Sequence, residues 1–130
     1  MACFMAKPFE HLAGTSMHLH VSLADTDGNN LYASDDKAGT PLLRQSVGDM
    51  LALLPDSLLL FCPNANSYRR YQANSYAPLA PTWSINHRNA SLNVSTGPAC
   101  TRHIEHRLPP QLFDEKLNFG GVHLPLRNRK

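Results

Sequence analysis

The chain has 130 residues, about the length of one domain; 42% of them are hydrophobic and 17% are charged. This composition predicts a packed core and excludes a chain that is disordered throughout. The net charge of +2 is too small to indicate binding to nucleic acid or to a membrane surface by charge alone.

Three further features of the sequence favour a cytoplasmic protein with no membrane partner. Apolar runs such as Leu58–Cys62 are far shorter than the roughly 20 residues of a membrane span. Residues 1–10 lack a basic segment followed by an apolar one, so we expect no signal peptide. The three cysteines, Cys3, Cys62 and Cys100, form no Cys-x-x-Cys pair, which favours reduced thiols over disulfides or a zinc site.

The first predicted element is a strand over Ser16–Leu23, where polar and apolar residues alternate strictly. The polar face carries Ser16, His18, His20 and Ser22. Asp25–Asn30 predicts a turn, after which Leu31 and Tyr32 begin a return strand.

A helix is predicted next over Pro41–Leu54. Pro41 suits a first helical position, and apolar residues recur at steps of three and four along the segment. Pro55 is expected to end or kink this helix, and Leu58–Cys62 forms a second short apolar piece. Asn64–Pro81 has no clear period and is interpreted as an ordered functional loop.

Three short strands complete the prediction, over Thr82–Ile85, Ser91–Ser95 and Arg102–Leu108. The last strand alternates, so that His103, Glu105 and Arg107 share one face while Ile104 and Leu108 take the other.

Basic residues between Asn64 and Leu108 are all arginines. There are five of them, with no lysine and only one carboxylate, Glu105. A guanidinium forms fixed, forked hydrogen bonds to carboxylate or phosphate, whereas an ammonium offers a point charge. The segment therefore favours an anion site over an ordinary basic surface; the arginines are Arg69, Arg70, Arg88, Arg102 and Arg107.

Two histidines and one carboxylate are the candidate metal ligands. His18 and His20 lie two apart on a strand and can reach one pocket, and Glu105 would favour a hard cation. The alternatives are a solvated polar strand face for the histidines and an ordinary Arg–Glu pair for Glu105. We expect all three side chains to converge on one face of neighbouring strands.

The arginines suggest a second convergence. We expect Arg70, Arg88 and Arg107 to line a single electropositive pocket. Like charges held close together repel one another, and a bound anion would relieve that repulsion. Tyrosines and Trp83 between the arginines leave a nucleic-acid surface of stacked bases as an alternative, which the small net charge disfavours.

Four blocks of the sequence resemble the catalytic domain of glutamine synthetase. They are Ala6–Pro8, Gly14–Leu23, Asn66–Arg70 and Arg102–Pro109, in the family's order and approximate spacing. Tyr68–Trp83 is similar to the γ-glutamyl-polyamine, or γ-glutamylputrescine, branch. The resemblance implies a partial catalytic domain over residues 1–109 and a divergent tail over 110–130.

The fold that this resemblance implies is α+β, with an antiparallel curved sheet and flanking helices. The implied reaction is ATP-dependent ligation of glutamate to an amine, either a polyamine or ammonia, through a γ-glutamyl phosphate. Mg²⁺ or Mn²⁺ would be the cofactor and ATP the co-substrate, with homo-oligomers in the full-length family. No nucleic acid or membrane is implied as a partner.

Site roles carry over by motif as implications of the resemblance. His18 and Glu105 would bind the metal, His20 and Ser22 the nucleotide, Arg70 and Arg107 glutamate, and Arg88 would be catalytic by facing the phosphoryl group.

The sequence also departs from the family's pattern. Asn93 stands where the family usually has a phosphate-facing arginine, and Tyr76 stands where it has a flap glutamate. The metal-binding glutamates of the family's preceding strands have no counterpart here, so we expect an incomplete, inactive fragment. The alternatives are a non-catalytic remnant that binds anions or metal and, less favoured, a nucleic-acid-binding module.

Overall fold

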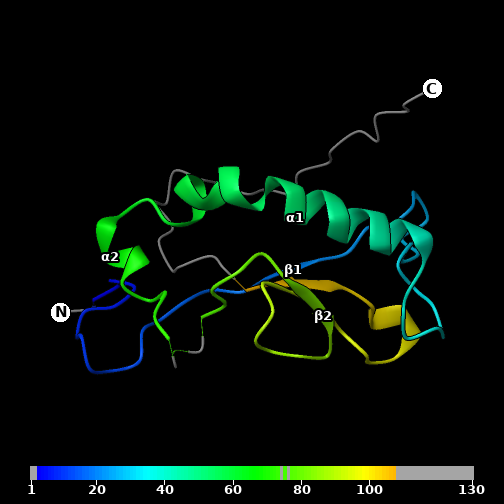
Figure 1. Cartoon of the computed structure of the whole chain (residues 1–130). Coiled ribbons are helices and arrows are strands. Elements are labelled where there is room, and N and C mark those ends of the chain that lie inside the picture. The colour runs from blue at the N-terminus through cyan, green and yellow to red at the C-terminus, as the bar shows by residue number, and fades with distance from the viewer. Residues whose placement is uncertain (1–2, 74, 76, 108–130) are drawn as a thin grey trace.

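The computed structural model describes residues 3–73, 75 and 77–107. Its main elements are one long helix and a four-stranded sheet, with the helix lying over one face of the sheet (Figure 1). In chain order they are β1 (Leu19–Val21), α1 (Pro41–Phe61), α2 (Ala65–Tyr68), β2 (Trp83–Ile85), β3 (Leu92–Val94), a 3₁₀ turn (Ala99–Thr101) and β4 (Ile104–His106). The predicted α+β class is confirmed.

The sheet has the strand order β1-β4-β3-β2 and is mixed. β4 pairs antiparallel with both β1 and β3, as predicted, whereas β2 and β3 run parallel, which corrects the expectation of an antiparallel sheet throughout. Three-residue strands are only about 10 Å long, so the short segment between them can return the chain to the same end. Asn86 starts this return with a φ of 51°, in the left-handed region that asparagine tolerates.

The hydrophobic core lies between α1 and the sheet. The helix contributes Leu43 and Val47, and the sheet contributes side chains that are fully shielded from solvent. The core cluster comprises Tyr32, Leu43, Val47, Leu92, Val94 and Ile104. The opposite face of the sheet is therefore free to carry polar groups.

α1 begins where the sequence predicted and ends later. Thr40 caps it by accepting a hydrogen bond from the Leu43 amide at 3.2 Å, and Pro41 is the first residue of the helix. The predicted end at Pro55 is wrong, because the helix continues through the apolar piece to Phe61. Proline removes one helical hydrogen bond, and burial of Leu54 before it and Cys62 after it holds both halves of the helix in place.

The β-strands are shorter than predicted. Of Ser16–Leu23 only Leu19–Val21 pairs with β4, and the return strand at Leu31 and Tyr32 is reduced to one bridge between Ala24 and Asn30. Tyr32 instead turns into the core, with its amide bonded to the Asn30 side chain at 3.0 Å. The segment interpreted as a loop, Asn64–Pro81, contains α2.

The N-terminal segment lies beside α2 (Figure 1). The Asn66 side chain accepts a hydrogen bond from the Lys7 amide and donates one to the Lys7 carbonyl, both at 2.7 Å. Two of the blocks that carried the resemblance are thus fastened to each other, although they are far apart in the sequence.

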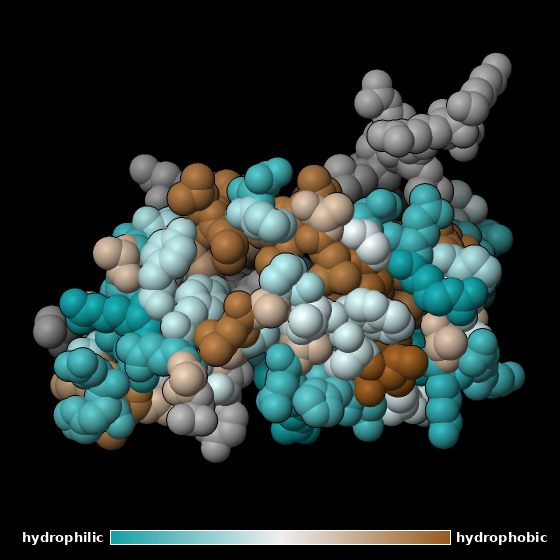
Figure 2. Space-filling model, in the orientation of Figure 1, coloured by the Kyte–Doolittle hydropathy of each residue, from teal (hydrophilic) through white to brown (hydrophobic). Residues whose placement is uncertain are grey.

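Apolar side chains gather on the surface over α1 (Figure 2). Leu53, Leu59 and Leu60 on that helix are each more than 60% exposed. Within the described part of the chain, no helix combines the length and hydropathy needed to cross a membrane.

His106 provides a test of how the core is built. Its ring lies on the α1 side of β4, 4.9 Å between centroids from Phe61, and burial lowers the pKa of His106 from 6.5 to about 4. Between these values the unfolded chain binds a proton that the folded chain does not. Stability must therefore fall as the pH decreases through this window.

We expect His106 alone to account for a loss of about 2 kcal/mol in the free energy of unfolding between pH 7 and pH 5. Urea denaturation at both pH values measures it. His106→Leu should remove this part of the pH dependence, and so should His106→Gln, which stays polar but does not titrate. An unchanged pH dependence in both variants would contradict the assignment.

Candidate functional site

The candidate site is built around the Glu105 carboxylate on the polar face of the sheet. Its Oε1 accepts a hydrogen bond from Arg107 Nη1 at 2.7 Å and lies 2.8 Å from His18 Nδ1. Its Oε2 accepts a hydrogen bond from Asn93 Nδ2 at 2.9 Å. Strand register explains the contact with Asn93, which lies directly opposite Glu105 on β3. His18 is two residues before His20, the residue opposite Glu105 on β1.

Glu105 is ionised at neutral pH. Burial raises the pKa of its carboxyl, but the hydrogen bond from Asn93 and the positive charge of Arg107 outweigh that effect, with His18 adding to them. The net pKa of Glu105 therefore lies below its ordinary value. A fixed negative charge thus sits on this face of the sheet, with one donor on β3 and two beside the ends of β1 and β4.

His18 is neutral at the same pH. Burial and the charge of Arg107 lower the pKa of His18 by more than Glu105 raises it. Since a carboxylate only accepts hydrogen bonds, the proton is on Nδ1 and is donated to Glu105. Arg107 Nη1, 3.5 Å from Nδ1, is then a neighbour rather than a hydrogen-bond donor, and Nε2 of His18 keeps its lone pair for a ligand.

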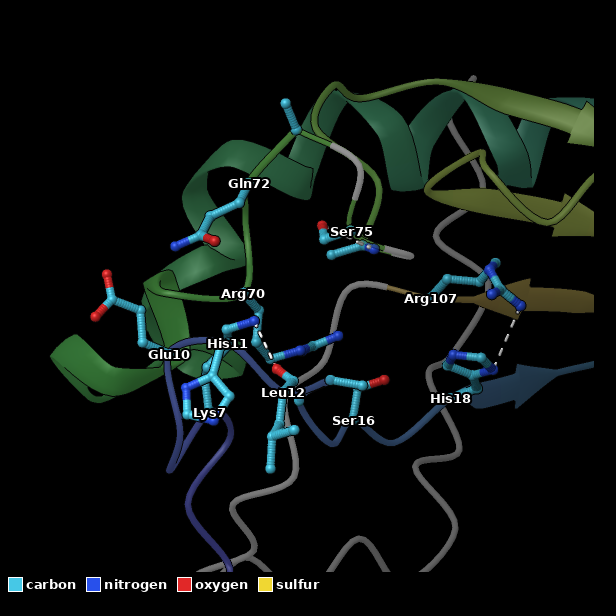
Figure 3. Close-up of a pocket in the computed structure, with 14 residues that line it drawn as sticks. Lys7, Glu10, His11, Leu12, Ser16, His18, Arg70, Gln72, Ser75 and Arg107 are labelled. Carbon is cyan, nitrogen blue, oxygen red and sulfur yellow. Dashed lines mark hydrogen bonds between the residues drawn. The ribbon is translucent and has the colours of Figure 1, made fainter.

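A cavity of about 500 Å³ lies on one side of this cluster (Figure 3). We call it the Arg70 cavity, because the Arg70 side chain points into it from the segment after α2. His18 and Arg107 line it at the end away from Lys7 and Glu10. The guanidinium of Arg70 is buried and its Nη1 has no hydrogen-bond partner among the described residues; burial lowers the pKa of Arg70.

Close backbone approach forms the floor of the Arg70 cavity. A Cβ at Gly14 would lie 2.5 Å from the Ala6 carbonyl oxygen and 3.0 Å from Arg70 Cγ, so only glycine fits. Lys7 is also buried and donates from Nζ to the Leu12 carbonyl at 2.9 Å. The close approach of the Gly14 and Ala6 backbones thus places two buried cations beside one cavity.

A second cavity, of about 490 Å³, lies on the other side of the cluster. We call it the Arg88 cavity; it shares His18 and Arg107 with the Arg70 cavity. It is lined by His18, His20, Asn86, Arg88, Asn93, Ser95, Thr96, Gly97, His103, Glu105 and Arg107. Arg107 and His18 therefore stand on the wall between the two cavities.

The structure confirms one predicted convergence and corrects the other. His18 and Glu105 are in contact, and His20 lines the same cavity. The single pocket for three arginines is wrong: Arg70 and Arg88 line different cavities, and Arg107 lines both. The physical reason is that Arg107 and His18, held by Glu105, fill the space between them.

The two candidate nucleotide-binding residues, His20 and Ser22, lie together in a further, smaller hollow. His20 stacks obliquely on His103, with ring centroids 4.8 Å apart, and Ser22 lies beside it in a smaller hollow of about 200 Å³. Arg102 has a structural role instead, because it donates to the carbonyls of Ser95 and Ser34 at 2.6 and 2.8 Å. Tyr76, Leu108 and the tail over 110–130 lie outside the described residues.

Sequence reasoning missed two members of this site. Asn93 was noted as a departure and not as a partner of Glu105, although its position between Leu92 and Val94 places it on the polar face. No pattern in the sequence indicated that Lys7 lines the site. The predicted metal site is incomplete, because the described residues contain no group of three metal-binding side chains.

These residues and the fold place the chain in the glutamine synthetase catalytic-domain family. The family model "Glutamine synthetase, catalytic domain" matches residues 1–112. The chain is similar to γ-glutamylputrescine synthetase PuuA of Escherichia coli K12, with 37% identity over 107 residues, covering 82% of this chain and 23% of that protein. It is also similar to γ-glutamylethanolamide synthetase GlnA4 of Streptomyces coelicolor, with 39% identity over 125 residues, covering 92% and 26%.

A solved structure, "Apo GmaS without ligand", shares the fold with a TM-score of 0.69 and 28% identity, covering 83% of this chain and 24% of that one. The chain thus spans about a quarter of the length of these relatives.

Removing the central carboxylate tests the electrostatics of the site. Glu105→Ala leaves the buried Arg107 guanidinium without its counter-charge, and we expect a loss of about 3 kcal/mol in the free energy of unfolding. Urea denaturation at pH 7 measures it. Adding Arg107→Met to that variant should restore much of the stability, whereas equal instability of the double variant would contradict a charge-based explanation.

Proposed function

We propose that this chain supplies part of the active site of an ATP-dependent ligase that joins the γ-carboxylate of glutamate to an amine. The observation that carries the proposal is the wall between the two cavities, where Glu105 fixes Arg107 and His18. A carboxylate in one cavity and a phosphoryl group in the other would meet at these residues. Membership of a family whose named relatives are glutamate–amine ligases supports this reading.

Glutamate is assigned to the Arg70 cavity. About 500 Å³ suits a small amino acid, and the buried Arg70 has a guanidinium nitrogen with no described partner. Arg107, at the opposite end, would face the other carboxylate. Two arginines spaced along the cavity match the two carboxylates of glutamate.

The phosphates of ATP are assigned to the Arg88 cavity. Arg88 would face the transferring phosphoryl group, and His20 and Ser22 would line the nucleotide side. Fixed arginines stabilise the charge that develops as the glutamate carboxylate attacks phosphorus and ADP leaves. The amine then attacks the γ-glutamyl phosphate and phosphate leaves.

His18 and Glu105 would be the ligands of a divalent cation, Mg²⁺ or Mn²⁺. While His18 Nδ1 donates to Glu105, Nε2 lies on the far side of the ring, so one cation could take both side chains only after that hydrogen bond is broken. Both oxygens of Glu105 already accept hydrogen bonds, and the described residues offer no third metal-binding side chain to the group. These donors fit part of a coordination shell and not a whole one. A cation held by them alone would keep mostly water ligands and bind weakly.

The acceptor that we propose is an organic amine. The names of three relatives specify putrescine, ethanolamide and isopropylamine products or substrates, which supports a carbon-bearing amine such as a polyamine over ammonia. We further propose a cytoplasmic location and a homo-oligomeric assembly. The second candidate function is non-catalytic anion binding, which the incomplete metal ligand set favours.

Glutamate binding to the full chain tests the assignment of the Arg70 cavity. Isothermal titration should show weak binding that Arg70→Gln reduces at least tenfold, because a forked, charged hydrogen-bond pair is lost. Arg69→Gln is the matched control, since Arg69 is the exposed neighbour and should leave affinity unchanged. Equal effects of the two variants would contradict the assignment.

Activity of the 130 residues assayed alone tests whether the site is sufficient. We expect no amine-dependent phosphate release from glutamate, ATP and putrescine with Mg²⁺ or Mn²⁺, because phosphoryl transfer depends on complete positioning of charge. Turnover above background that disappears in His18→Ala would show that these residues suffice.

A further inference from the structure

Asn93 uses both ends of its side-chain amide in one orientation. Nδ2 donates to Glu105 Oε2 at 2.9 Å, and Oδ1 accepts from the backbone amide of His87, also at 2.9 Å. The orientation is unambiguous, because a carboxylate only accepts and an N–H only donates. The amide therefore links the central carboxylate to the turn that follows β2.

That turn carries Arg88. It is fastened at a second point, where the Ser84 hydroxyl donates to the His87 carbonyl at 2.9 Å. Ser84, Asn93 and Glu105 lie side by side across three strands, so they present their side chains on one face. The backbone of His87, the residue before Arg88, is thus held at its N–H by Asn93 and at its carbonyl by Ser84.

The turn has few other anchors. Asn86 has a φ of 51°, and Arg88, which is exposed and lines the Arg88 cavity, has no side-chain hydrogen bond to another of the described residues. A long side chain on an exposed turn loses conformational entropy when it binds an anion. Fixing the backbone beforehand reduces that loss.

We propose that Asn93 is a positioning residue, which holds the Arg88 turn in register with Glu105, Arg107 and His18. The inference rests on the proposed function for the phosphate role of Arg88, and it concerns how that role is supported. Through the Asn93 amide, the turn that carries Arg88 is positioned by the Glu105 carboxylate. Arg107 is positioned by the same carboxylate, to which it donates directly.

The first measurement follows the turn itself, without any ligand. In the full chain, amide exchange at His87 should be at least tenfold faster in Asn93→Leu, and the heteronuclear NOE of Arg88 should fall. Ser91→Ala is the matched control, because it removes a buried hydrogen bond of the neighbouring segment, to the Ala80 carbonyl, outside this network.

The second measurement uses inorganic pyrophosphate as the probe and calorimetry as the readout. Asn93→Leu should weaken binding about fivefold when Arg88 is present and should have no effect in the Arg88→Gln background. If the role of Asn93 were only structural, Asn93→Leu would weaken pyrophosphate binding equally with Arg88 present and in the Arg88→Gln background. Asn93→Ser, too short to bridge both partners, replaces Asn93→Leu if that variant does not fold.

The outcomes separate the two ideas. Unchanged exchange at His87 in Asn93→Leu overturns the inference, and so does an equal loss of pyrophosphate affinity in both backgrounds. If the unsubstituted chain binds no pyrophosphate, the phosphate role of Arg88 in the proposed function fails. The exchange data then still decide whether Asn93 holds the turn.

Discussion

The partly buried carboxylate of Glu105, which is surrounded by three hydrogen-bond donors, is the interaction on which the polar face of this sheet depends. The strands pair over only three residues each, so the ladders alone fix little of how the strands lie. Glu105 adds side-chain links to β3 through Asn93 and to His18 just before β1. It also compensates the buried charge of Arg107, which would otherwise be expensive to remove from water.

Successive side chains of β4 and the residue after it point alternately to the core and to the cavities. Ile104 and His106 face the core beneath α1, while Glu105 and Arg107 face the cavities. Two titratable neighbours on this strand therefore behave oppositely: His106, buried against the Phe61 ring, stays neutral, and Glu105, with three donors, stays ionised. The stability of the core and the charge of the site are carried by one three-residue strand.

Arginine serves three purposes in this small structure, and the surroundings decide which. Arg102 binds backbone carbonyls and fastens two loops, Arg107 is neutralised by a carboxylate, and Arg70 is buried with a nitrogen directed to a cavity. Arg102 is structural because both of its terminal nitrogens donate to backbone carbonyls. Arg70 and Arg107 line the Arg70 cavity and Arg102 does not, so position at a cavity separates the candidate ligand-binding arginines from the structural one.

The sequence by itself determined the elements and faces whose patterns are local. Pro41 and the apolar stripe placed the start of α1, alternation placed His18 with His20 and Glu105 with Arg107, and the motif blocks indicated the family. Tertiary structure decided what depends on distances between segments: the helix passing Pro55, the parallel pairing of β2 and β3, the separation of Arg70 from Arg88, and the role of Asn93. Periodicity reports which way a side chain points on its own element. Which groups then meet is set by packing between segments far apart in the chain, and no local pattern encodes that.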